Sequence, residues 1–72
     1  MANLKFHIIA RSLAPEIAGD EILKTFRAPS FLQARCAFWR FCDKKGKEYY
    51  SLDLVEDGDE NFAIAHFNNS EV

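Results

Sequence analysis

The chain has 72 residues, of which 49% are hydrophobic and seven are phenylalanine. This number of apolar residues can form one small core but not two, so we expect a single domain over 1–72. No apolar run approaches the ~18 residues of a membrane-spanning helix, and residues 1–12 are too short and too often interrupted by charge to be a signal peptide. The net charge of −2 is segregated into +5 over 22–49, −6 over 50–72 and −1 over 1–21, whereas a generic nucleic-acid binder is basic throughout.

The first predicted element is a half-buried strand over residues 4–10, because apolar and polar side chains alternate there. Its apolar side consists of Leu4, Phe6, Ile8 and Ala10. The proline and glycine of residues 12–21 are typical of a hairpin loop. Residues 22–28 contain β-branched and aromatic side chains and predict a second strand, so these two strands should form a hairpin.

A helix is predicted between Ser30 and Gly46. Ser30 is an N-cap candidate, and Gln33 three residues later completes an S-x-x-Q capping box. Gly46 is typical of a helix C-terminus, and the preceding Lys44 and Lys45 suit the negative end of the helix dipole.

Two further strands are predicted over 48–55 and 61–67, joined at 56–60 by a tight turn of the Asp-Gly type. The inward residues of the third strand are expected to be Tyr50, Leu52 and Leu54. The predicted fold class is therefore α+β, with the order ββαββ and one helix packed on a four-stranded antiparallel or mixed sheet.

One helix covers only one face of such a sheet, and the open face is expected to be partly apolar. Its predicted residues are Lys5, His7, Ile9, Arg11, Leu23, Thr25, Arg27, Tyr49, Asp53, Val55, Ala63, Ala65 and Phe67. Either the sheet curls, or a partner covers part of this face. A homodimer formed through the open face is one such arrangement.

The predicted helix has two apolar groups. At about 100° per residue, the core stripe spans an arc of ~100° and consists of Phe31, Ala34, Phe38, Phe41 and Cys42. A second group, about 100° away, consists of Leu32, Cys36 and Trp39. In one interpretation this group packs under a neighbouring hairpin, with the stem of Arg35 lying along it. In the other, Trp39 forms a recognition patch with Arg35 and Arg40, because Trp and Arg are favoured interface anchors.

No catalytic or metal motif stands out. His7 and His66, taken with Cys36 or Cys42, lack the C-x-x-C or H-x-x-x-H spacing that normally marks a metal site. Mid-helix cysteines in a Phe-rich segment favour inert packing over a Cys-His nucleophile. The acidic turn does not match a calcium loop, because Val55 occupies a ligand position. We therefore expect no enzymatic activity, no metal and no cofactor.

The two cysteines are not expected to form a disulfide. Cys36 and Cys42 are six residues apart, which separates them by about 9 Å along the helix and ~120° around it. A disulfide needs Cα atoms within about 7 Å. Free thiols in a small domain indicate a reducing compartment, so we expect a cytoplasmic location.

The segment RAPSFLQARCAFWRF, residues 27–41, resembles the helix opening of the large-subunit ribosomal proteins called LX in archaea and eighteen-a in eukaryotes. The shared features are Ala28-Pro29, Ala34 followed by the basic Arg35, the Phe38-Trp39 pair, and Phe41. LKFHIIARSLAPE and NFAIAHF are similar to the first and closing strands of that family. The chain differs from the family in being acidic and short.

The resemblance implies a structural module that sits on ribosomal RNA and has no enzymatic activity. It also implies that the phosphate-facing residues are Arg35, Arg40, Lys44 and Lys45, with Trp39 packing beside them.

Two functions from different classes follow. The first is a small inhibitor or adaptor, of the type that phages produce, that docks on a protein or ribonucleoprotein complex. The alternative is an RNA-binding, ribosome-associated module, whose binding should weaken steeply with salt. Neither requires a membrane or a small-molecule substrate. The candidate partner-binding residues are Trp39, Arg35, Arg40, Lys44, Lys45, Asp57, Asp59 and Glu60.

Overall fold

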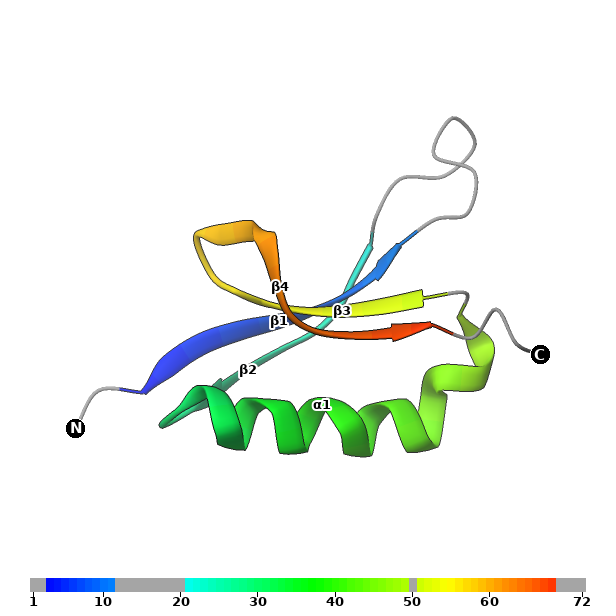
Figure 1. The fold of residues 1–72 in the computed structure, drawn as a ribbon, viewed down its shortest axis with the longest axis horizontal. Helices are drawn as coiled ribbons and strands as arrows, with labels where there is room; N and C mark the ends of the chain where they lie inside the picture. The colour runs from blue at the N-terminus through cyan, green and yellow to red at the C-terminus, as the bar shows by residue number, and fades with distance from the viewer. Residues whose placement is uncertain (1–2, 12–20, 50, 69–72) are drawn as a thin grey trace.

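One helix lies across one face of a four-stranded antiparallel sheet (Figure 1). The computed structural model describes residues 3–11, 21–49 and 51–68. Its elements are β1 (Leu4–Arg11), β2 (Glu21–Ala28), α1 (Phe31–Lys45), a short 3-10 helix η1 (Gly46–Glu48), β3 (Ser51–Glu56) and β4 (Asp59–Asn68). The strands lie in the order β2-β1-β3-β4. The predicted α+β class and ββαββ order are confirmed. Most of the predicted loop over 12–21, together with Tyr50 and residues 69–72, falls outside the described residues, and Glu21 begins β2.

The first strand of the chain is a central strand of the sheet, because β1 pairs with β2 on one side and with β3 on the other. Ile8 lies opposite Leu54, and Ala10 lies opposite Leu52. Side chains at paired positions share one face of a sheet, so the predicted alternation of β1 carries these residues to the helix side.

Helix α1 begins as its capping residue predicts. The backbone N–H of Gln33 donates to Oγ of Ser30 at 3.3 Å, and the N–H of Ala34 donates to the carbonyl of Ser30 at 3.1 Å. The helix ends at Lys45, immediately before Gly46. Gly46 has a φ of −59°, which any residue can adopt. A glycine is needed there for another reason: a Cβ at this position would lie 2.8 Å from the ring of Phe67.

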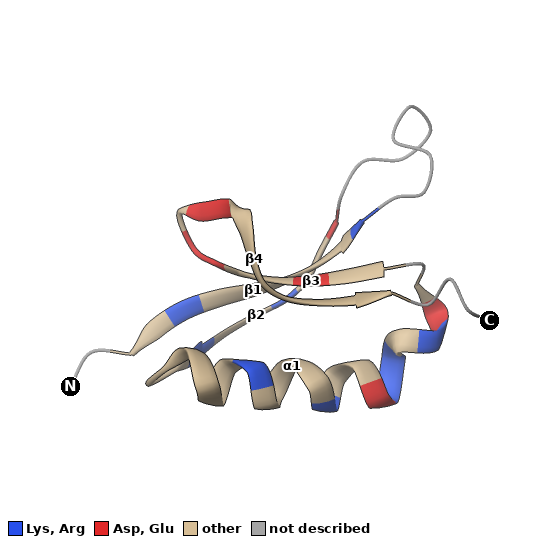
Figure 2. Cartoon of the chain, in the orientation of Figure 1, with Lys and Arg blue, Asp and Glu red and all other residues tan. Residues whose placement is uncertain are grey.

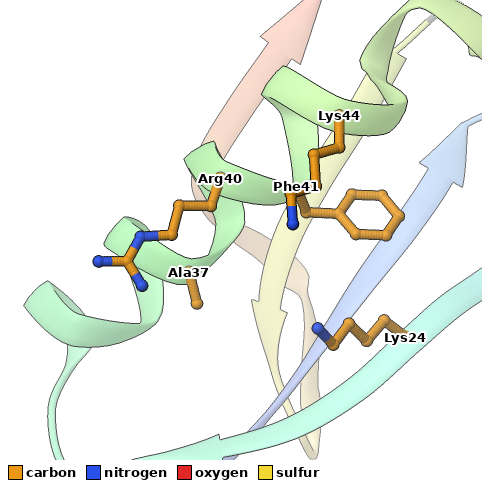
Figure 3. Close-up of a pocket in the computed structure, with 5 residues that line it drawn as sticks. All are labelled: Lys24, Ala37, Arg40, Phe41 and Lys44. Carbon is orange, nitrogen blue, oxygen red and sulfur yellow. The ribbon is translucent and has the colours of Figure 1, made fainter.

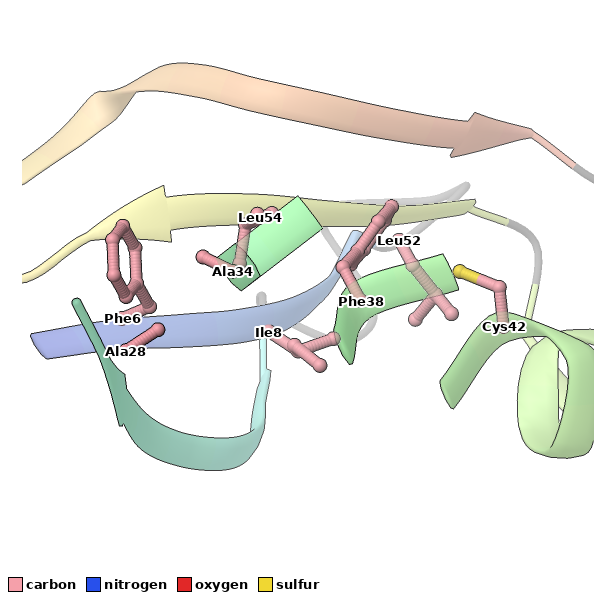
Figure 4. Close-up of a cluster of buried hydrophobic side chains, with 8 residues drawn as sticks. All are labelled: Phe6, Ile8, Ala28, Ala34, Phe38, Cys42, Leu52 and Leu54. Carbon is pink, nitrogen blue, oxygen red and sulfur yellow. The ribbon is translucent and has the colours of Figure 1, made fainter. Parts of the chain in front are cut away.

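The core lies between α1 and the sheet (Figure 4). It consists of Phe6, Ile8, Ala28, Ala34, Phe38, Cys42, Leu52 and Leu54. Of the predicted core stripe of the helix, Phe31 and Phe41 are not fully buried. Phe31 instead places its ring edge-on to Phe6, with 5.7 Å between ring centres.

Register shifts in two ladders, β3–β4 and β1–β2, correct the predicted assignment of the open face. Leu54 pairs with Ala65, whereas the next residue, Val55, pairs with Ala63, so Ile64 is the extra residue. A bulge of this kind reverses which face the following residues occupy. A second irregularity falls in the β1–β2 ladder between Ile8 and Ile9. Four residues predicted on the open face therefore pack against the helix-side core; they are Leu23, Tyr49, Ala65 and Phe67.

The open face is narrower than predicted because the β3–β4 hairpin curls over it. The predicted tight turn is confirmed at Gly58, whose φ of +88° is one that glycine adopts readily. In Figure 1 this turn rises on the side of the sheet opposite α1. Nη2 of Arg11 on β1 donates to the carbonyl of Glu60 on β4 at 3.4 Å. Val55 and Ile9 are buried on this face, although no helix among the described residues covers it. Ile22, which lies opposite Ile9 on this face, is 54% exposed, and the homodimer through the open face stays a prediction.

Within the described part of the chain, no helix combines the length and the apolar character needed to cross a membrane.

Candidate functional site

A pocket of about 250 Å³ opens between α1 and β2 (Figure 3). We call it the basic pocket; its five lining residues are Lys24, Ala37, Arg40, Phe41 and Lys44. Three of the five are cations and none is acidic. The pocket therefore combines positive charge with a partly buried aromatic ring.

Local structure explains why these residues meet. Ala37, Phe41 and Lys44 follow one another at helical spacing along one flank of α1, and Arg40 lies at the outer edge of that flank. Lys24 comes from β2 and pairs with Ile8, whose side chain faces the helix. The nearby bulge places Ile22 opposite Ile9 on the other face. Lys24 is thus turned toward α1 by strand pairing.

Basic residues outnumber acidic ones on α1, and the β3–β4 turn carries mostly acidic side chains. In Figure 2, lysine and arginine mark α1, whereas the β3–β4 turn is acidic. The basic pocket and the acidic turn lie on opposite sides of the sheet. A polyanion approaching the helix side is therefore not opposed by the acidic turn at close range.

The predicted patch of Trp39, Arg35 and Arg40 is divided between two flanks of the helix. Arg40 lines the basic pocket beside β2. Trp39 points toward β4, where its ring meets the edges of Phe38 at 5.0 Å and Phe67 at 6.4 Å between centres. Trp39 remains 45% exposed. Trp39 therefore packs beside the core and also presents a surface, and its role in recognition stays a prediction.

The remaining predicted basic residues differ in their surroundings. Lys44 lines the basic pocket with Arg40. Lys45 is exposed and lies 4.0 Å from a carboxylate oxygen of Glu48. Such an exposed pair contributes little to stability. Arg35 is exposed and does not line the basic pocket.

The predicted acidic residues also separate into two kinds. Asp59 is exposed and lies opposite Glu56 in the hairpin. Asp57 turns toward β1, where its Oδ1 lies 2.8 Å from Nε2 of the buried His7. This hydrogen bond, helped by the charges of Lys5, His7 and Arg27, lowers the pKa of Asp57.

The hydrogen bonds of His7 define its proton positions. The ionised carboxylate of Asp57 can only accept, so Nε2 of His7 carries the hydrogen that it donates. The other ring nitrogen, Nδ1, lies 2.9 Å from Oγ1 of Thr25 on β2. In neutral His7 the Thr25 hydroxyl therefore donates to Nδ1.

A cluster of potential metal ligands is formed by His7, Asp57 and Glu60, whose ligand atoms all lie within 4.8 Å of one another. Sequence reasoning predicted no metal site, because these residues lie up to 53 positions apart and show no local spacing. The sequence indicated this cluster only indirectly. The acidic turn follows a predicted strand, and that strand could pair with the strand that carries His7.

The metal ligands first considered from the sequence are kept apart by the fold. His66 is hydrogen-bonded through Nδ1 to Oδ1 of Asp53, and Nε of Arg11 donates to Oδ2 of the same carboxylate at 2.8 Å. Cys42 lies in the core on the helix side. Burial, with a smaller effect from Asp43, raises the pKa of Cys42 to about 11, so its thiol is not an activated nucleophile.

Comparison of the chain with protein-family models, with curated proteins and with solved structures found no match. Its own geometry is therefore the basis for a functional assignment.

Proposed function

We propose that this domain is a non-catalytic module that docks on a ribonucleoprotein complex by binding RNA through the basic pocket. The observation that carries the proposal is the convergence of Lys24, Arg40 and Lys44 around Phe41 from two separate elements. Because the cations come from a helix and a strand, their positions relative to one another are held by the fold.

The chemistry of the pocket suits a phosphate backbone. Arginine forms a planar fork of donors that matches phosphate oxygens, and lysine adds a mobile point charge. The partly buried ring of Phe41 offers an apolar surface beside those charges. Aromatic rings next to cations are a common way to hold single-stranded nucleic acid.

The distribution of charge in this acidic chain would determine which side of the domain faces the RNA. With a net charge of −2, the domain has little general attraction for polyanions. RNA would be attracted to the helix side and repelled by the acidic β3–β4 turn. The resemblance to ribosomal proteins also supports RNA binding on the helix side, because it implies that Arg40 and Lys44 face phosphates.

The test is RNA binding measured by fluorescence anisotropy over a range of salt concentrations. We expect Arg40→Ala and Lys44→Ala to weaken binding and to reduce the slope of log affinity against log salt by about 1 each. Lys47→Ala is the matched control, because Lys47 is an exposed lysine of η1 outside the pocket. Equal losses in Lys44→Ala and Lys47→Ala, or no RNA binding by the wild-type chain, contradict the proposal.

A second candidate function is docking on a protein through the other flank of α1. The observation in its favour is an exposed apolar stripe, with Leu32 63% and Trp39 45% exposed. The two residues are seven apart, so they lie about two turns apart along the same flank, with the exposed Cys36 between them. This stripe suits the inhibitor or adaptor function predicted from the sequence, because tryptophan is a favoured interface anchor.

Pull-down from lysate with and without nuclease distinguishes the two candidates. Partners that are lost after nuclease treatment and with Arg40→Ala indicate RNA binding. A protein that is retained after nuclease, but lost with Trp39→Ala, indicates docking through the apolar stripe.

A further inference from the structure

Three potential metal-ligating side chains converge where the β3–β4 turn meets β1, on the face opposite the basic pocket. They come from separate segments: His7 from β1, Asp57 from the turn and Glu60 from β4. Their ligand atoms lie within 4.8 Å of one another. His7 is buried, whereas both carboxylates are exposed, so an ion held by all three would keep an open side toward water.

His7 is held in place from behind. Its Nδ1 lies 2.9 Å from Oγ1 of Thr25, which fixes the plane of the imidazole ring and directs Nε2 toward the carboxylates. Histidines that bind metals almost always donate a hydrogen bond from their second nitrogen, and the Thr25 oxygen lies where it can accept one from Nδ1. Thr25 is therefore already placed as the outer partner of a metal-binding His7.

The spacing of the ligand atoms suits one ion. Nε2 of His7 and Oδ1 of Asp57 lie 2.8 Å apart. With metal–ligand bonds of about 2.0–2.2 Å, two atoms at this separation can bind the same ion at adjacent positions. Glu60 is exposed, so its flexible side chain can close the remaining distance.

The charges around the cluster narrow the choice of ion. Lys5 and Arg27 act on Asp57, and Arg11 donates to the backbone carbonyl of Glu60. These cations oppose an ion that would be held by charge alone, such as Mg²⁺ or Ca²⁺. An ion that also bonds to imidazole nitrogen gains affinity that these charges do not remove.

We propose that His7, Asp57 and Glu60 bind one divalent ion of the Zn²⁺ class, which fastens the β3–β4 hairpin to β1. The ion takes the place of the hydrogen on Nε2 of His7. Nδ1 then carries the hydrogen and donates it to Thr25, so the histidine stays neutral. The site lies on the opposite face of the sheet from the basic pocket, and it is independent of RNA binding.

The experiment uses the full chain carrying Cys36→Ser, which removes the exposed thiol as a competing ligand. Co²⁺ is titrated and followed by its visible absorption, and Zn²⁺ is then added to displace it. We expect saturation at one ion per chain, a rise in Tm with Zn²⁺ and no such rise with the same concentration of Mg²⁺.

The matched pair of variants is Glu60→Gln and Asp59→Asn, which neutralise two exposed acids of the same hairpin. We expect Glu60→Gln to lose at least about tenfold in Co²⁺ affinity, and Asp59→Asn to bind like the parent chain. Because neither side chain is buried, both variants should fold. NMR provides a readout that needs no variant, since Zn²⁺ should shift the ring signals of His7 and leave those of His66 in place.

The proposal is overturned if Co²⁺ gives no visible band, if Glu60→Gln and Asp59→Asn bind equally, or if the ring signals of His66 shift in place of those of His7.

Discussion

The two faces of the sheet are buried in different ways. The face under α1 is covered by a helix and filled by apolar side chains such as Phe6, Phe38 and Leu54. The opposite face has no covering helix among the described residues, yet His7 and Asp53 are buried there. The first face thus buries apolar side chains alone, whereas the second buries paired polar groups beside apolar residues such as Ile9 and Val55.

The polar groups buried on the second face all have hydrogen-bonding partners. His7 contacts Thr25 and Asp57, and Asp53 contacts both Arg11 and His66. No buried side-chain nitrogen or oxygen lacks a partner in the part of the chain that is described. A polar group buried without such a partner costs about 1–3 kcal/mol. Because these groups are paired, the face opposite α1 can hold ionisable side chains near the surface without a large loss of stability.

The largest effect is expected when the apolar face is opened. Phe38 is fully buried in the core, and Phe38→Ala should lower the free energy of unfolding by about 3–5 kcal/mol, because it leaves a cavity. Urea denaturation measures this loss. The comparison variant is Phe62→Ala on β4, since Phe62 is 59% exposed and its loss should stay below about 1 kcal/mol. If the two variants lost equal free energy of unfolding, burial under α1 would not be what makes Phe38 stabilising.

A smaller loss is expected when the polar face is disrupted. Asp53→Ala removes the acceptor shared by Arg11 and His66, and we expect it to lower the free energy of unfolding by about 2 kcal/mol. The same denaturation measurement applies. Asp59→Ala removes an exposed acid of the same sheet and should change stability by less than about 0.5 kcal/mol. If both variants behave alike, the pairing of Asp53 does not stabilise this face.

The smallest effect concerns the reactivity of the two thiols, which tests whether water reaches the face covered by α1. Burial raises the pKa of Cys42 to about 11, whereas Cys36 is exposed. At pH 8, iodoacetamide should alkylate Cys36 rapidly and Cys42 only after denaturation, as followed by mass spectrometry. The raised pKa also makes stability depend on pH. The thiol has its ordinary pKa of 9.0 in the unfolded chain, so the unfolded state loses this proton at a lower pH than the folded state. The contribution of Cys42 to the free energy of unfolding is therefore complete below pH 9 and is lost as the pH rises toward 11. Equal alkylation of both thiols in the native state would show that water reaches the helix-covered face.

Much of the local structure could be predicted from the sequence. Ser30 caps the helix, the alternation in β1 selects its helix-facing side, and Gly58 marks the hairpin turn. The strand is not half-buried as predicted, because His7 and Ile9 on its other side are buried as well. These features depend on residues close together in the chain, whose conformational preferences act over a few positions. They were sufficient to predict the order of the elements and the α+β class.

Tertiary structure decided which of these residues meet. The bulge at Ile64 moved Phe67 to the helix side, where its ring fills the space left by Gly46. Pairing of Lys24 with Ile8 placed Lys24 on the helix side of the sheet, where it completes the basic pocket with Arg40.

The cluster of His7, Asp57 and Glu60 was also decided by tertiary structure. It forms because β1 pairs with β3 and the hairpin curls back. Strand pairing, bulges and curl join residues that are distant in sequence. The periodicity of a single strand or helix therefore determines which side of an element is buried, while the contacts between elements determine the candidate sites.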